Sequence, residues 1–129
     1  MVLAADGCTF RYRRPRPGAL VVAIVGHDKG QFGTATLDEI SLALKRDRPL
    51  ELFIDARKGV AAALSVSEDW TRYFANNRAD FIRVHVLAGS KVVQLTVAIA
   101  QHLSRTGNLI QIYSDPEIFE ARLASLRGR

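Results

Sequence analysis

Cysteine and long hydrophobic runs are scarce in this chain of 129 residues. Cys8 is the single cysteine, so neither an internal disulfide nor a cysteine-based zinc cage can form. No apolar run reaches the roughly 18 residues with which a helix crosses a membrane. The apolar stretch Met1–Ala5 is also shorter than that of a signal peptide, and Asp6 and Gly7 follow it. We therefore expect a cytoplasmic protein.

Low-complexity tracts, internal repeats and linkers are absent as well, and the composition is that of a folded domain. Hydrophobic residues make up 48% of the chain and charged residues 24%, which is typical of globular proteins and excludes intrinsic disorder. Lysine and arginine together number 18 and aspartate and glutamate 13, which gives a formal charge of +5. A chain of this length buries about two-thirds of its unfolded surface without a metal or a disulfide. We expect a single domain over residues 1–129.

Residue groupings that carry metal or catalytic chemistry are also missing. His27, His85 and His102 lie far apart, and none has a second histidine or a cysteine at ligand spacing. The loop at residues 26–33 holds three glycines but matches neither the dinucleotide fingerprint nor the P-loop pattern. Asp55 ends a predicted strand and is interpreted as a turn or ion-pair residue. We expect no metal, no cofactor and no enzymatic activity, although folding could still assemble an active site from distant residues.

Hydrophobic periodicity predicts strands and helices in alternation. Apolar runs and alternating patterns indicate strands at residues 8–13, 19–25, 50–55, 81–87 and 109–113. A helix is predicted after each of the last four strands. The predicted start and stop signals are capping boxes at Thr36/Glu39 and Ser65/Glu68 with Ser67 as a competing N-cap, the N-cap Ser90, the Asp115–Pro116 pair, and Gly107 as a C′ residue. In the last helix, the residues expected to face inward are Ile118, Phe119, Leu123 and Leu126.

The predicted element order is β-β-α-β-α-β-α-β-α. Strands that alternate with helices imply crossover connections between parallel strands, and the short Pro-Gly connection before Ala19 predicts an antiparallel hairpin. We therefore predict a two-layer α/β fold. Its sheet is mixed, mostly parallel and five-stranded, with the helices packed mainly on one face.

Three segments carry a resemblance to a known family: Leu50–Asp55 (LELFID), Val84–Ser90 (VHVLAGS) and Gln111–Phe119 (QIYSDPEIF). With the element order, they make nearly the whole chain similar to the STAS domain, the SpoIIAA-like fold of bacterial anti-sigma-factor antagonists. The resemblance implies a signalling module that acts through protein partners.

The functional motif of that family is absent. In the family, an Asp-Ser-Ser-Gly-like segment follows the third strand, and a partner kinase phosphorylates its first serine. An alignment on Asp55 without gaps places the segment at residues 63–66, where Leu64 occupies the acceptor position. Ser65 and Ser67 are neighbouring hydroxyls that a kinase could modify. Helix capping explains both serines without phosphorylation, and it is the favoured interpretation.

A basic segment is the sharpest charge feature of the chain. It could bind an acidic partner, an anionic membrane surface or nucleic acid. The favoured interpretation is a solvated edge strand whose arginines prevent edge-to-edge pairing. Helix-turn-helix and RNA-binding signatures are absent, so we expect no nucleic-acid partner. The segment comprises Arg11, Arg13, Arg14 and Arg16.

The predicted third helix is apolar on nearly every side, which requires cover on most of its surface. That cover could be a second copy of the chain, a ligand in an apolar pocket, or the neighbouring helices. Aromatic residues of the second helix extend the same surface, because aromatic side chains are favoured at interfaces. The predicted interaction face comprises Val92, Val93, Leu95, Thr96, Ile99, Trp70 and Tyr73.

Two main hypotheses about function follow. The first is a non-enzymatic STAS-like interaction or regulatory module without the usual phosphoacceptor, which binds a protein partner, forms a homodimer, or both. The second is a carrier or sensor of a lipid-like or other apolar small ligand. A large exposed apolar patch would favour the first hypothesis, and an apolar cavity would favour the second.

Overall fold

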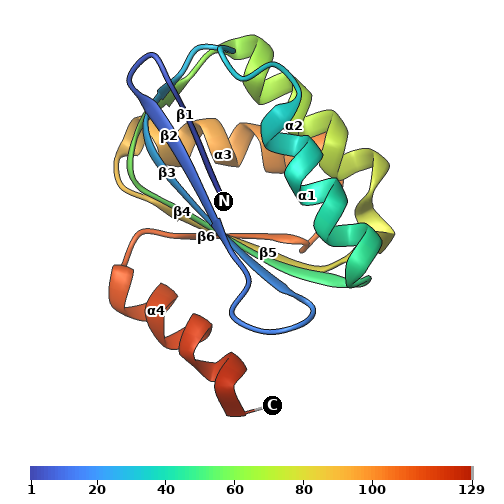
Figure 1. Cartoon of the computed structure of the whole chain (residues 1–129). Coiled ribbons are helices and arrows are strands. Elements are labelled where there is room, and N and C mark those ends of the chain that lie inside the picture. The colour runs from blue at the N-terminus through green and yellow to red at the C-terminus, as the bar shows by residue number, and fades with distance from the viewer. Residues whose placement is uncertain (129) are drawn as a thin grey trace.

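The computed structural model describes residues 1–128, whose arrangement is shown in Figure 1. Over this range the chain forms one six-stranded sheet and four α-helices, with short 3-10 turns at Arg78–Asp80 and Ser125–Gly128. The strands and α-helices, in chain order, are β1 (Val2–Ala5), β2 (Cys8–Arg13), β3 (Ala19–Asp28), α1 (Ala35–Arg46), β4 (Leu50–Ala62), α2 (Leu64–Asn76), β5 (Phe81–Ala88), α3 (Lys91–Ser104), β6 (Ile110–Tyr113) and α4 (Pro116–Ala124).

The strands lie in the sheet in their sequence order, with β1 and β6 at the edges. The first three strands form an antiparallel meander, and β3, β4, β5 and β6 pair in parallel. Helices α1, α2 and α3 cover one face of the sheet and α4 covers the other (Figure 1). The predicted α/β class, the mixed and mostly parallel sheet and the location of most helices on one face are confirmed.

The predicted number of strands is wrong, because β1 precedes the strands expected from the sequence. β1 and β2 are joined by Asp6 and Gly7, which have φ angles of 45° and 76°. Two central residues with positive φ are characteristic of the type I′ hairpin turn, for which Asp-Gly is a preferred pair. The signal for the sixth strand was therefore present in the sequence as Asp6–Gly7.

The predicted helix boundaries are confirmed where a side chain caps the helix. Ser90 accepts a hydrogen bond from the backbone N–H of Val93 at 3.2 Å, and Asp115 accepts one from Glu117 at 2.9 Å. Pro116 then occupies the first turn of α4, as expected.

Both predicted capping boxes are wrong. Helix α1 begins two residues earlier than expected, with Thr34 at its N-cap, and Thr36 is buried in its first turn. The hydroxyl of Tyr12 donates to the carbonyl of Thr36 at 3.0 Å, so a contact with the sheet positions this turn. Helix α2 begins after Ala63, whose methyl side chain cannot accept a capping hydrogen bond, and Ser65 lies in the first turn of the helix.

The predicted C′ residue of α3, Gly107, is also wrong, because Arg105 adopts the left-handed conformation there with φ 55°. The hydroxyl of Ser104 donates to the carbonyl of Gln101 at 3.0 Å and lies 2.9 Å from the hydroxyl of Thr106. These side-chain contacts close the helix two residues before the glycine.

The sheet separates two clusters of buried apolar side chains. The larger cluster lies under α1, α2 and α3, and the smaller one lies under α4. Phe119 and Leu126 are buried in the smaller cluster as predicted, and Leu123 packs against it. Ile118 was expected to face inward, but it is 58% exposed because it lies on the outer side of α4.

A close approach between two chain segments makes Gly26 more sensitive to substitution than other glycines with positive φ. A Cβ atom at Gly26 would lie 2.0 Å from the carbonyl oxygen of Gly7, whereas one at Gly33 would meet nothing within 4 Å. We expect Gly33→Ala to cost about 1–2 kcal/mol through its left-handed backbone alone. Gly26→Ala should lower the free energy of unfolding by clearly more. Urea unfolding of the two variants measures the difference, and equal losses would contradict it.

Candidate functional site

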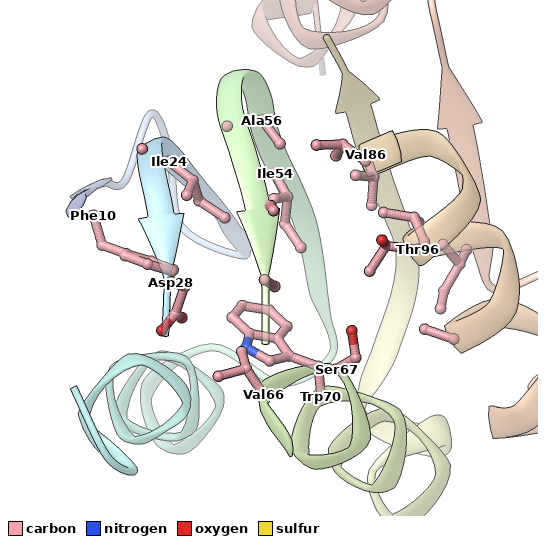
Figure 2. A pocket seen from close by; sticks show the side chains of 18 of the residues that line it. Phe10, Ile24, Asp28, Ile54, Ala56, Val66, Ser67, Trp70, Val86 and Thr96 are labelled. Carbon is pink, nitrogen blue, oxygen red and sulfur yellow. The ribbon is translucent and has the colours of Figure 1, made fainter. Parts of the chain in front are cut away.

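An apolar pocket lies between α2, α3 and the sheet, near the carboxyl ends of β3, β4 and β5 (Figure 2). Its cavity volume is about 130 Å³. An apolar cavity of about 150 Å³ binds benzene in another protein, so this pocket has room for a ligand of similar size. Apolar side chains form nearly all of its lining, chiefly Phe10, Ile54, Trp70, Phe74, Val86 and Val97.

Small residues at the end of β4 explain why the pocket remains open. Ala56, Gly59, Ala61 and Ala62 line it from the sheet, and Ala100 lines it from α3. These residues provide little side-chain volume where α2 and α3 meet the sheet. Strand β4 was predicted to end at Asp55, but it continues to Ala62 because β3 also continues and pairs with it.

Asp28 is the ionisable residue at the pocket, and it is only 6% exposed. Its Oδ1 atom accepts a hydrogen bond from the backbone N–H of Gly30 at 3.0 Å. Two hydroxyl residues, Ser67 and Thr96, also line the pocket, but the Thr96 hydroxyl donates to the carbonyl of Val92 at 2.9 Å. Figure 2 shows Asp28 beside Phe10 and Trp70 at one end of the pocket, with Thr96 and Val86 at the other end.

The predicted interaction face is divided between this pocket and the outer surface of α3. Val93 is buried and lines the pocket together with the half-buried Thr96. On the outer side, four large apolar side chains recur at helical spacing and form what we call the α3 ridge: Val92 (60% exposed), Leu95 (62%), Ile99 (50%) and Leu103 (61%).

The two aromatic residues of the predicted face do not join the α3 ridge. The ring of Trp70 lies 6.5 Å from that of Phe10 and 5.9 Å from that of Phe74, at the pocket. Tyr73 packs against Phe74 and Phe81, and its hydroxyl lies 2.9 Å from that of Ser41. Burial raises the pKa of Tyr73, and the hydrogen bond to Ser41 opposes that rise.

The serines considered as phosphorylation sites lie in the first turn of α2. Ser65 is exposed, and Ser67 is half-buried at the pocket. Leu64, which the ungapped alignment on Asp55 predicted at the acceptor position, is 76% exposed. The position is therefore accessible in this fold, but its side chain has no hydroxyl group.

The basic segment was expected to form an edge strand. This expectation is wrong, because β1 covers that side of β2. Arg11 and Arg13 point to solvent from the sheet face opposite Phe10 and Tyr12. Arg14 forms an ion pair with Asp47 at 3.2 Å, and Arg16 donates to the carbonyl of Pro17 at 2.9 Å. The four arginines are thus divided between the open sheet face and local contacts.

A buried polar network under α4 was missed by sequence reasoning. The Nε2 atom of His85 lies 2.7 Å from Oε2 of Glu51, and its Nδ1 atom lies 2.8 Å from the hydroxyl of Tyr113. The imidazole also stacks on Phe53 at 4.4 Å between centroids. His85 is 0% exposed, so the network satisfies core polar groups rather than contacting a substrate. The sequence feature that could have indicated this network is Glu51, a charged residue within the apolar run LELFID.

Asp55 acts as the ion-pair residue that the sequence suggested. Its carboxylate accepts hydrogen bonds from Nε of Arg57 at 3.0 and 3.1 Å, and Arg57 also pairs with Glu120 of α4. These ion pairs connect β4 to α4.

Over residues 1–128, no group of three histidine, cysteine, aspartate or glutamate side chains is arranged to hold a metal ion. Within the same range, no helix is long and apolar enough to cross a membrane.

The fold is SpoIIAA-like, the class to which the STAS domain belongs. An uncharacterized protein of the DUF3478 family from Shewanella loihica has this fold and matches with a TM-score of 0.61 and 16% identity, over 94% of this chain and 98% of that one. The anti-sigma factor antagonist SpoIIAA, in its unphosphorylated form, matches with a TM-score of 0.59 and 13% identity, over 93% and 97% of the two chains.

An anti-sigma factor antagonist from Mycobacterium paratuberculosis is similar to the same degree. Its TM-score is 0.59 at 15% identity, and the match covers 94% of this chain and 97% of that one. No model of a known protein family matches the sequence, and no curated protein is similar to it. At these identities the comparisons establish the fold, and the predicted SpoIIAA-like architecture is confirmed.

The buried network makes folding stability depend on pH. Burial lowers the pKa of His85 below its ordinary value of 6.5, and the hydrogen bond to Glu51 only partly opposes this effect. The unfolded chain therefore binds more protons than the folded chain. The stability that neutral His85 contributes is fully present above about pH 6.5 and is lost as the pH falls through the lower pKa of the folded state.

We expect His85→Gln to flatten this loss, measured by urea unfolding between pH 7 and 5. His102→Gln, at an exposed position of α3, is the matched control and should keep the wild-type slope.

Proposed function

We propose that this chain is a non-enzymatic regulatory module that binds a protein partner through the α3 ridge. The observation that carries the proposal is the row of four apolar side chains, each at least half exposed, on one side of a single helix. Single exposed apolar residues are ordinary, but a contiguous set marks an interaction surface. The SpoIIAA-like neighbours include two anti-sigma factor antagonists, which supports a regulatory role for the fold.

The charges around the α3 ridge favour a different protein over a second copy of this chain. Helix α3 contains no aspartate or glutamate, and it has Lys91 at its start and Arg105 at its C-cap. An antiparallel pair of α3 helices would place Lys91 of one copy near Arg105 of the other. Like charges placed together disfavour such a dimer, whereas an acidic rim on another protein would complement both ends.

The absence of the family's phosphoacceptor serine separates this chain from a phosphorylation-controlled antagonist. Leu64 stands at that position, and Ser65 beside it is exposed. We propose that partner binding here is controlled by something other than phosphorylation of the aligned residue. Phosphorylation of the neighbouring Ser65 or Ser67 is the alternative form of control, and it would add negative charge at the start of α2.

Substitution on the α3 ridge tests the proposed surface. We expect Leu95→Glu to abolish partner binding, because it places a charge among the apolar anchors, while folding stability changes by no more than about 0.5 kcal/mol at this exposed position. The matched control is Gln94→Glu, which adds the same charge to the neighbouring exposed residue. Binding is measured by photo-crosslinking from position 99 in cells that naturally make the chain, with the captured protein then tested as a purified partner.

Three results would contradict the proposal. Crosslinking from position 99 could yield no protein, or Leu95→Glu and Gln94→Glu could reduce capture equally. Native mass spectrometry could also show a dimer of this chain that Leu95→Glu dissociates. That last result would replace the different protein with a second copy.

A further inference from the structure

The pocket described above has a feature that a purely apolar site would lack, which is the carboxyl group of Asp28. The residue is 94% buried. Its Oδ1 atom accepts a hydrogen bond from the backbone N–H of Gly30 at 3.0 Å, and its Oδ2 atom accepts none from residues 1–126. Over the same residues Asp28 takes part in no ion pair with a lysine, arginine or histidine. Buried carboxyl groups are normally paired with a cation, and this one has no cationic partner among the described side chains.

Aromatic rings surround the same end of the pocket. Phe10 and Trp70 lie near Asp28 in Figure 2, and all three residues line the pocket. Their rings are 6.5 Å apart at an angle of 27°. Aromatic faces attract ammonium groups through the ring quadrupole, and a neighbouring carboxylate adds a direct ion pair. A carboxylate ligand would instead be repelled by Asp28.

We propose that this pocket binds a small amine whose apolar body fills the cavity and whose ammonium group faces Asp28. The cavity of about 130 Å³ sets the size of that body at an aromatic ring or a short alkyl chain. The site lies on the inner side of α3, opposite the α3 ridge, so it goes beyond the proposed protein interaction and does not depend on it.

Three probes of equal chain length separate the contributions of the apolar body and the ammonium group: hexylamine, hexanol and hexanoate. Trp70 is the single tryptophan of the chain, so its fluorescence reports directly on the pocket. We expect saturable changes with hexylamine at a concentration about tenfold lower than with hexanol, which corresponds to about 1.4 kcal/mol. Hexanoate should bind most weakly.

Asp28→Asn tests the ammonium contact, because it keeps the shape of the side chain and removes its charge. The variant should lose the preference for hexylamine and bind hexylamine and hexanol about equally. Asp38→Asn, at an exposed position of α1, is the control and should keep the preference. An unchanged preference in Asp28→Asn would overturn the assignment of the ammonium site.

Filling the cavity tests the apolar part of the site. Ala100→Leu places additional carbon atoms in the pocket and should abolish binding of hexylamine and hexanol. Ala75→Leu, at an exposed position of α2, is the matched control and should bind as the wild type does. Ala61→Leu fills the same pocket from β4 and replaces Ala100→Leu if that variant fails to fold.

The outcomes distinguish this site from the proposed protein interaction. Loss of binding in Ala100→Leu or Ala61→Leu, together with unchanged binding in Leu95→Glu, supports the pocket. Failure of all three probes to produce a saturable fluorescence change, confirmed by backbone NMR shifts, overturns it. Tightest binding by hexanoate also overturns it.

Discussion

The burial of β4 on both faces is the constraint on which the rest of the structure depends. This strand pairs with β3 on one side and β5 on the other, so its backbone is satisfied only within the sheet. Leu52 and Ile54 face the cluster under α1, α2 and α3, while Phe53 faces α4. Glu51 points to the α4 side as well, and its contact with His85 makes its burial tolerable. Helix α4 is therefore needed as a cover for one face of the central strand.

The two faces of β4 are filled differently. Under α4, stacked rings and hydrogen bonds fill the space, because Phe53 and Tyr113 lie against Phe119 and His85 stacks on Phe53. On the other face the end of β4 is lined by alanine and glycine, and packing ends in a cavity. Natural interiors contain few voids of this size. Both proposed binding surfaces lie around α3, with the pocket on its inner side and the α3 ridge on its outer side.

Much of this arrangement could be predicted from local sequence patterns. Five strands and four helices follow from hydrophobic periodicity, and Ser90 and Asp115 were recognised as caps because their own side chains form the hydrogen bonds. The capping box at Ser65 failed because α2 already begins after Ala63, and the one at Thr36 failed because a contact with a distant strand determines where α1 begins. For α1, that contact is the hydrogen bond from Tyr12.

The candidate sites depended on contacts between distant parts of the chain. The apolar character of α3 was visible in the sequence, but the division between Val93 and Leu95 is decided by the position of α2 and the sheet. The neighbours of Asp28 in the pocket come from strands and helices far along the chain, so no local pattern indicated it. Glu51 and His85 are 34 residues apart, and only the parallel register of β4 and β5 brings them together.

The antiparallel start of the sheet has a consequence for how the chain acquires its structure. Strands β1, β2 and β3 are joined by short turns, so their pairing closes only small loops. Pairing of β3 with β4 requires the whole of α1 to cross over first. Topologies with local contacts form faster than those with distant ones. The meander is therefore expected to assemble first and to present the edge of β3 as the template for β4, after which β5 and β6 are added in turn.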